Sequence, residues 1–205
     1  MDNSVQALES QSMVKHSDEK IFLIDKCDSR KRCFRRKNER FARNCIQRVG
    51  TKQGIMVWAA ISIDGKSDLV SFNGNVTANR YQNEALQPAL VPFVNRHNRP
   101  MTFQQDNAPA HRALTITNWF AANNIHVFGP WPSKSPDMNP IENLWDQLDR
   151  AVRRRPNPPR NPREMFQVLQ EEWANLDQRR VRRLVLSMRR RCTALFEAAG
   201  GHTRY

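Results

Sequence analysis

Hydrophobic residues in the first two thirds of the chain fall into short runs separated by polar turns. Short apolar runs rich in Ile, Val, Phe and Trp are typical of buried β-strands. Asp64-Gly65 is a hairpin signal, so the run that follows it is expected to pair back on the run before it. The pattern predicts a sheet of short strands. The candidate strands are residues 21–24, 55–61, 69–72, 102–107 and 125–128.

Helical spacing alternates with these runs. Thr77 is expected to cap a helix that Pro88 would kink or shorten. A second helix is predicted over residues 111–122. Its inward residues are expected to be Leu114, Thr117 and Phe120/Ala121.

The strongest local helix signal stands near residue 140. Asn139 is a good N-cap, Pro140 suits the first helical position, and Glu142 would be the third residue. The helix that follows carries one apolar stripe, which predicts a buried face. The stripe consists of Ile141, Leu144, Trp145, Leu148 and Val152.

Prolines and arginines dominate the end of the chain. Four prolines within residues 153–162 are expected to end the preceding helix, and two Arg-rich amphipathic helices follow. Strands, then alternating helices and strands, then helices indicate an α/β fold, a mixed sheet flanked by helices with an Arg-rich helical C-terminal tail. The expected segments are a poorly ordered start at 1–12, a domain at 13–155, a Pro-rich linker at 156–163 and completing C-terminal helices at 164–205.

Charge adds a prediction about partners. The chain holds 33 Lys and Arg against 20 Asp and Glu, a net charge of +13, which favours a polyanionic partner such as nucleic acid over a merely solvated basic surface. No apolar run reaches the roughly 18 residues of a membrane span. The four cysteines lack C-x-x-C spacing and indicate reduced thiols, not a zinc site. The basic residues expected to contact DNA are Arg35, Arg36, Lys37, Arg153, Arg154 and Arg155.

Two acids stand where catalytic carboxylates are expected. Asp106 follows a strand-like run and Glu142 opens a helix, with 35 residues between them. Taken alone, Asp106 is more typical of an Asx turn and Glu142 of a capping box. A third acid should come from the first strand, where Asp18, Asp25 and Asp28 are all candidates and the apolar pattern favours Asp25.

Other polar and aromatic residues near these acids in the sequence have more than one possible role. His111 either touches substrate or orients Asp106, although a lone His near a helix start is more often a surface or capping residue. Trp131 is a candidate for stacking on bases, whereas the spacing of Trp145 favours the core. The remaining acids rank below Glu142. They are Asp137, Asp146 and Asp149.

Carboxylates on a basic chain point to a particular chemistry. Cutting a phosphodiester needs a strong nucleophile and relief of charge on the leaving oxygen, and two divalent ions about 3.5–4 Å apart supply both. Mg²⁺ prefers hard oxygen ligands, so a few carboxylates and a substrate phosphate suffice. The pattern therefore predicts metal-dependent cutting or joining of nucleic acid.

Several stretches together resemble the catalytic domain of Tc1-like DNA transposases, in the Tc1/mariner superfamily. The resemblance covers the chain from about residue 13 to its end, and its most specific part is the run from Trp131 to Trp145. The other matching stretches are Ser-Asp-Glu-Lys at 17–20, Glu-Arg-Phe-Ala at 39–42, Met-Val-Trp at 56–58 and Phe-Gln-Gln-Asp-Asn-Ala-Pro-Ala-His at 103–111.

The resemblance implies an RNase H-like fold and a DDE triad of Asp18, Asp106 and Glu142 holding two Mg²⁺ or Mn²⁺ ions. It overrules the pattern-based preference for Asp25 and makes Glu19 a neighbour of the ligand. The implied reaction is endonucleolytic nicking at transposon ends and strand transfer into target DNA, hence DNA transposition and integration in the nucleus. A homodimer in a synaptic complex is the implied assembly.

Two departures from the family pattern lead to alternatives. No helix-turn-helix modules precede Asp18, so the chain is expected to be an N-terminally truncated copy. The residues before Asp18 are mostly polar, which is poor for a central strand. There are two alternatives. One is a catalytically inactive remnant that binds DNA non-specifically through its Arg-rich faces. The other is another RNase H-like nuclease that acts on RNA–DNA hybrids or junctions.

Overall fold

A computed structural model describes residues 14–24, 53–96, 101–129 and 138–198. Several expected features lie outside the described residues, and the predictions on them stay predictions. They are the segment 1–12, Asp25, Asp28, Arg35, Arg36, Lys37, Trp131 and Asp137.

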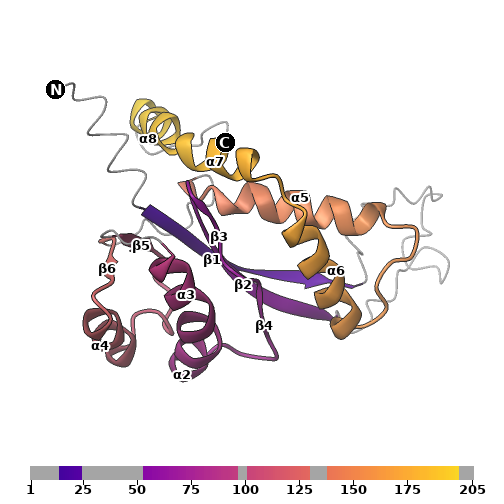
Figure 1. The fold of residues 1–205 in the computed structure, drawn as a ribbon, viewed down its shortest axis with the longest axis horizontal. Helices are drawn as coiled ribbons and strands as arrows, with labels where there is room; N and C mark the ends of the chain where they lie inside the picture. Colours follow the sequence, from indigo (N-terminus) through magenta and orange to yellow (C-terminus); the bar gives the residue numbers. More distant parts are fainter. Residues whose placement is uncertain (1–13, 25–52, 97–100, 130–137, 199–205) are drawn as a thin grey trace, which may run out of the picture.

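The described strands form a mixed sheet in the order β3-β2-β1-β5-β6, with β4 pairing on β2 (Figure 1). β1 lies in the middle, antiparallel to β2 and parallel to β5. The hairpin expected at Asp64-Gly65 is confirmed, because β3 and β4 both pair back on β2. The strands are β1 (Val14–Leu23), β2 (Gly54–Ser62), β3 (Gly65–Lys66), β4 (Val70–Phe72), β5 (Thr102–Gln104) and β6 (His126–Val127).

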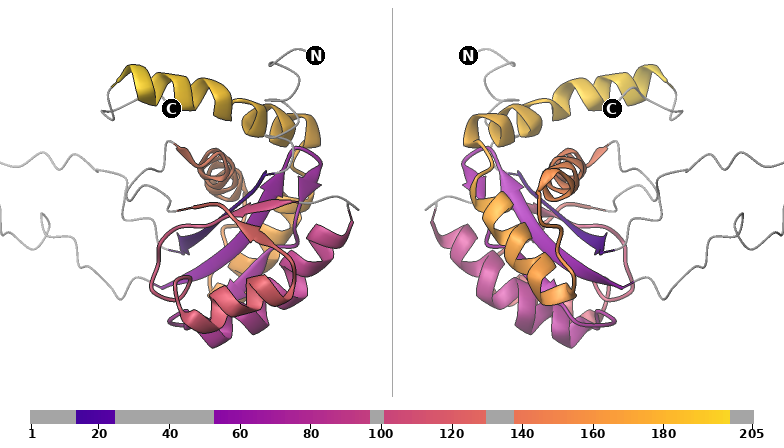
Figure 2. Two further views of the ribbon diagram at one scale, coloured as in Figure 1. Left: turned by 90° about the vertical axis from the view of Figure 1, so that its left-hand side faces the viewer. Right: turned by 90° about the vertical axis from the view of Figure 1, so that its right-hand side faces the viewer.

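Helices cover both faces of this sheet (Figure 2). One face packs against α5, α6 and α7, and the other against η1, α3 and α4. No helix within the described ranges is long and apolar enough to cross a membrane. The helices are α2 (Ala78–Arg80), η1 (Tyr81–Leu90), α3 (Val91–Asn95), α4 (Leu114–Ala122), α5 (Ile141–Arg154), α6 (Pro162–Ala174), α7 (Gln178–Leu186) and α8 (Met188–Glu197).

Alternation along β2 divides the core in two. Val57, Ala59 and Ile61 pack against α5 to α7, whereas Trp58 and Ala60 pack on the opposite face. Directly opposed residues of an antiparallel pair point to the same face. The residues of β1 from His16 to Leu23 are therefore assigned to a face by their partners in β2.

β1 is longer and more polar than the apolar run at residues 21–24 predicted. Its buried polar side chains all have partners: Lys15 Nζ donates to Phe93 O at 2.7 Å, and Ser17 Oγ donates to Gln104 O at 3.0 Å. His16 Nδ1 lies 3.3 Å from the side-chain oxygen of Gln104. A polar sequence can form the central strand because the sheet and α3 satisfy these groups.

Two helix predictions near the middle of the chain are corrected. The helix expected at 111–122 begins at Leu114, and its buried residues are Ile116 and Phe120. Leu114 is 74% exposed, and Thr117 and Ala121 are also exposed, so their predicted inward orientation was wrong. The prediction had started the helix at residue 111, and it therefore assigned the wrong residues to the buried face.

Pro88 was predicted to kink or shorten its helix, and the helix is not shortened there. Thr77 caps α2 through a hydrogen bond from Arg80 N to Thr77 Oγ1, as predicted. The chain then continues through the π-helical turns of η1, which contain Pro88, into α3. The wider π-helical winding accommodates the proline without ending the helix.

The C-terminal half follows the predicted stripe with shifted boundaries. All five stripe residues of α5 are buried, from Ile141 to Val152. α6 begins at Pro162 behind the Asn161 cap, so Pro162 opens a helix instead of ending the linker, because its missing N–H costs nothing in the first turn. The last predicted helix is divided at Ser187 into α7 and α8, and Phe196 is 87% exposed.

Candidate active site

Two neighbouring strands carry the first two acids. β1 and β5 run in parallel, with His16 opposite Gln104 at the last paired position. Two residues beyond each of these stand Asp18, still within β1, and Asp106, which lies past the last paired position. β5 ends at Gln104, and Asp106 lies in the segment that follows.

The start of α5 is tied to β1 beside Asp18. Asn139 Nδ2 donates to Ser17 O at 2.9 Å, and both residues are buried. Glu142 is the second residue of α5, one position earlier than predicted, in the turn where a helix favours a carboxylate. Its Oε2 accepts a hydrogen bond from Lys20 Nζ at 3.3 Å. That contact replaces the capping-box alternative.

Asp18 faces α5 in a poorly solvated place. Trp145 Nε1 donates to Asp18 Oδ2 at 3.0 Å, and Trp145 is part of the core as predicted. Burial, together with the negative charges of Glu142 and Glu19, raises the pKa of Asp18 to about 8 despite this hydrogen bond. Asp18 and Glu142 are therefore carboxyl groups brought close enough to repel each other.

Asp106 is held by two donors. Its Oδ1 accepts hydrogen bonds from the amide of Ala108 at 2.9 Å and from His111 Nδ1 at 2.6 Å. The hydrogen bond from His111 is the main reason why the pKa of Asp106 is lowered, although partial burial opposes it. Asp106 is thus ionised at neutral pH, in the form that binds a cation.

His111 bridges two carboxylates. Its side chain is 4% exposed, and its Nε2 lies 3.2 Å from Glu19 Oε1, an ion pair without hydrogen-bond geometry. Burial by itself would lower the pKa of His111, but Asp106 and Glu19 outweigh it and raise that pKa to about 10. His111 is therefore an imidazolium that orients Asp106, while its contact with DNA stays a prediction.

A tyrosine of η1 packs against this histidine. The ring of Tyr81 is fully buried, and its centroid lies 4.2 Å from that of His111. Tyr81 Oη donates to Gln105 Oε1 at 2.9 Å, and Gln105 Nε2 donates to His111 O at 3.4 Å. The ring of His111 and its backbone are both fixed by residues beside Asp106.

Glu19 is the site residue that the sequence interpretation set aside. Because neighbouring strand residues point to opposite faces, Asp18 faces α5 while Glu19 faces His111. Ligand atoms of Glu19, Asp106 and His111 all lie within 4.8 Å of one another. His111 is a ligand only after it loses its proton. The alternation of side chains along a strand is the sequence signal that places Glu19 and Asp18 on opposite faces of the sheet.

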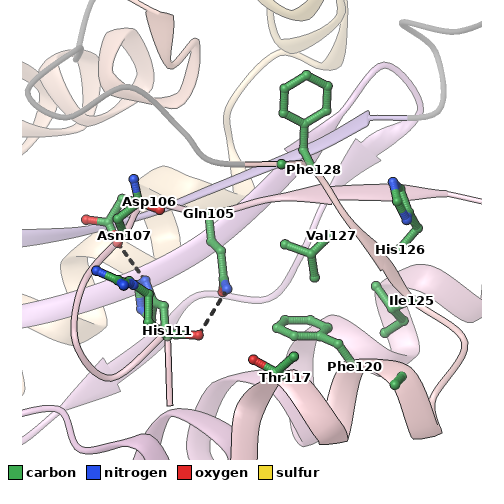
Figure 3. Close-up of a pocket in the computed structure, with 13 residues that line it drawn as sticks. Gln105, Asp106, Asn107, His111, Thr117, Phe120, Ile125, His126, Val127 and Phe128 are labelled. Carbon is green, nitrogen blue, oxygen red and sulfur yellow. Dashed lines mark hydrogen bonds and ion pairs between the residues drawn. The ribbon is translucent and has the colours of Figure 1, made fainter. Parts of the chain in front are cut away.

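A hollow of about 530 Å³ opens beside Asp106, between α4 and β6 (Figure 3). Val127 and Phe120 point toward each other across it, and Gln105 reaches in from the side of His111. The hollow gives the face around Asp106 room for part of a ligand.

The predicted arginine contacts differ in their surroundings. Arg153 Nη2 donates to Leu23 O and to Asp149, both at 3.0 Å, and so ties α5 to the end of β1. Arg155 pairs with Glu171 and Glu172 of α6. Arg154 is exposed. Two of these three side chains thus already brace the fold, and DNA contact by all three stays a prediction.

The donor set fits a hard divalent cation. Asp18 and Glu142 offer carboxylate oxygens, and burial, together with the charge of Glu142, raises the pKa of Asp18. A cation bound between them would relieve both the repulsion and the desolvation. Asp106 follows the adjacent strand, but its Oδ1 is paired with His111 on the side of Glu19, so a cation shared with Asp18 and Glu142 stays a prediction.

Comparison with known proteins identifies the family. Residues 14–163 match the family model described as DDE superfamily endonuclease. The chain belongs to the DDE superfamily endonucleases. This DDE chain is 35% identical over 153 residues to the Tcb1 transposase of Caenorhabditis briggsae, covering 74% of this chain and 54% of that protein. It is 32% identical over 155 residues to the Tc1 transposase of Caenorhabditis elegans, with the same coverage. The resemblance inferred from the sequence motifs is confirmed.

Solved structures give the fold of the DDE chain. The catalytic domain of Mos1 transposase with raltegravir and Mn superimposes with a TM-score of 0.71 at 18% identity, covering 98% of this chain and 90% of that one. The Mos1 strand transfer complex gives 0.74, covering 98% and 59%. The predicted RNase H-like sheet flanked by helices is confirmed. The DDE chain spans about half the length of the curated relatives it matches.

Proposed function

We propose that this chain is a transposase catalytic domain that cuts and joins DNA strands with Asp18, Asp106 and Glu142. The observation that carries the proposal is the facing pair of carboxyls on β1 and α5, with Asp106 at the end of the adjacent strand. Membership of the DDE endonucleases supports phosphodiester chemistry at these acids. DNA transposition and integration follow as the reaction class.

Each residue of the site has a part in this chemistry. Two Mg²⁺ or Mn²⁺ ions, when bound, would activate the attacking hydroxyl and neutralise the leaving oxygen. Asp18, Asp106 and Glu142 would hold them. His111 keeps Asp106 ionised and oriented, and Trp145 orients Asp18. Asp18 must release its proton before it serves as a ligand, because its pKa is raised to about 8.

The comparisons support these cofactors and partners. Structures of the Mos1 catalytic domain with Mn and with Mg share this fold, as do Mos1 strand transfer and paired end complexes. We infer transposon ends and target DNA as the partners of this chain, a homodimer as its synaptic form and the nucleus as its location. The net charge of +13 suits that polyanionic partner.

A plasmid assay tests the proposal. The purified chain should convert supercoiled plasmid to nicked circles with Mn²⁺ and lose this activity with chelator. Asp106→Asn should reduce nicking to the background level because it removes an oriented anionic ligand. Glu142→Gln should weaken Mn²⁺ binding in calorimetry. Asp146→Asn, an exposed acid of the same α5, is the matched control and should keep full activity.

Two outcomes would count against this function. Nicking that persists in Asp106→Asn points to a contaminating nuclease or to different catalytic groups. DNA binding without metal-dependent nicking, in a folded chain that binds Mn²⁺, identifies a DNA-binding remnant instead.

A further inference from the structure

Lys20 is a cation at the catalytic acids that the proposed reaction has not used. It lies two residues after Asp18 on β1 and therefore faces α5 with it. Its Nζ is 3.3 Å from Glu142 Oε2, and the side chains of Lys20 and Glu142 are 40% and 30% exposed. The ammonium group is thus partly open to solvent at the edge of the carboxylate pair.

Stability gives little reason for this pair. Ion pairs with this degree of exposure typically contribute little to folding, because solvent screens them. Lys20 instead lies beside Glu142 Oε2, an oxygen that would be needed as a ligand by a bound cation. An ammonium and a divalent cation compete for Glu142, so the pair should form mainly while metal is absent.

The other described cations near the acids are already engaged. Lys15 is buried and donates to Phe93 O, and Arg191 is buried and donates to Asn143 and Ser187. Arg153 donates to Leu23 O and Asp149. Lys20 lies on the same face of β1 as Asp18, and its ammonium group is partly exposed. Its flexible stem allows it to change partner by a small movement.

We propose that Lys20 is a phosphate-binding residue that changes partner from Glu142 to a backbone phosphate of the DNA strand when metal binds. This inference rests on the proposed function, since it takes DNA as the ligand of the face that carries Asp18 and Glu142. A lysine ammonium is an effective point-charge partner for phosphate. Lys20 thereby keeps Glu142 neutralised at rest and holds the strand beside the acids once loaded.

Mn²⁺ titration without DNA gives the first test. Lys20→Met removes the competing ammonium and should tighten Mn²⁺ binding about two- to fivefold, measured by calorimetry or by the EPR signal of free Mn²⁺. Arg163→Met, which removes an exposed cation from the first turn of α6, is the control and should leave the affinity unchanged. Equal or weaker Mn²⁺ binding by Lys20→Met would overturn the proposal.

A double-mutant cycle in chelator gives the second test, with a short labelled duplex and fluorescence anisotropy. Glu142→Gln releases Lys20 and should tighten DNA binding about two- to fivefold. In the Lys20→Met background most of this gain should vanish, whereas it should persist in the Arg163→Met background. Lys20→Arg should retain it. The same gain in all backgrounds would show that Glu142→Gln acts only through general charge.

Neither test depends on turnover. If both succeed while plasmid nicking fails, the phosphate contact of Lys20 stands and the catalytic proposal falls. If nicking succeeds and the cycle is additive, the catalytic proposal stands and Lys20 is a surface ion-pair residue.

Discussion

Some side chains at this site lie in surroundings that disfavour their charged form. Asp18 is the clearest case, because a buried carboxyl faces other carboxylates, and hydrogen bonds from Trp145 Nε1 and the backbone of Glu19 offset their effect only in part. Such an uncompensated group destabilises the fold where it is ionised. Proteins tolerate this cost where a ligand or metal needs the group.

Replacing Asp18 should expose this cost. The pKa of Asp18 is raised from 3.8 to about 8, so between these pH values the folded chain holds a proton that the unfolded chain releases. Stability contributed by Asp18 therefore falls as pH rises through this window. Asp18→Asn avoids the loss and keeps an oxygen for Trp145, so in chelator it should be more stable than the parent above pH 8 by a few kcal/mol.

Thermal melts across pH measure this difference. The advantage of Asp18→Asn should shrink to nothing near pH 4, and Mn²⁺ should stabilise the parent more than the variant. Asp146→Asn, exposed on α5, is the matched control for the change of charge. A stability difference that is constant with pH would mean that Asp18 is not electrostatically frustrated.

Among the elements, β1 and α5 do most to assemble the site, and α8 supports their junction. Arg191 of α8 is 3% exposed and donates to Asn143 Oδ1 of α5, the neighbour of Glu142, and to Ser187 Oγ at 3.0 Å. Its charge also contributes to lowering the pKa of His16 to about 4, after burial, which is the main cause. Residues beyond the family match at 14–163 thus reach the start of α5.

Truncating Arg191 should weaken this junction. Arg191→Ala removes charge-assisted hydrogen bonds to Asn143 and Ser187 and should lower the free energy of unfolding by about 2 kcal/mol or more, measured by urea titration. Arg190→Ala changes the exposed neighbour in the same helix and should stay within about 0.5 kcal/mol of the parent. Equal effects of the two variants would contradict a structural role for Arg191.

Across the whole molecule, the C-terminal helices and the sheet share one hydrophobic core. Leu169 and Trp173 of α6 and Val181 of α7 pack with β2 and α5 on one face. Trp173 also stacks on Trp145, with ring centroids 5.5 Å apart, and its Nε1 donates to Ser67 O at 2.8 Å. The proline-containing connection between α5 and α6 therefore does not separate two cores.

A cavity in α6 should destabilise the chain as a whole. Leu169 is fully buried, so Leu169→Ala should lower the free energy of unfolding by about 2–5 kcal/mol in a single cooperative transition. Gln170→Ala, on the exposed side of α6, is the matched control. A variant that melts α6 separately while the sheet stays folded would show that the C-terminal helices form an independent unit.

Local patterns in the sequence were sufficient for several elements and for the family. The stripe of α5, the strand at β2 and its hairpin follow from periodicity and turn chemistry, which depend on near neighbours. The motif around residues 131–145 pointed to the DDE endonucleases, and residues 14–163 match that family. The prediction that Asp18 is the first acid came from this resemblance, since the apolar pattern favoured Asp25.

Contacts between distant segments decided the rest. The polar strand β1 is stable because Phe93 and Gln104, far away in the chain, satisfy Lys15 and Ser17. Strand register and helix docking decide three contacts of the site. They are the hydrogen bond between Asp18 and Trp145 of α5, the bridging of Asp106 and Glu19 by His111, and the contact of Lys20 with Glu142. Such interactions have no local sequence signal, because burial and charge proximity arise only when the sheet and its helical layers pack together.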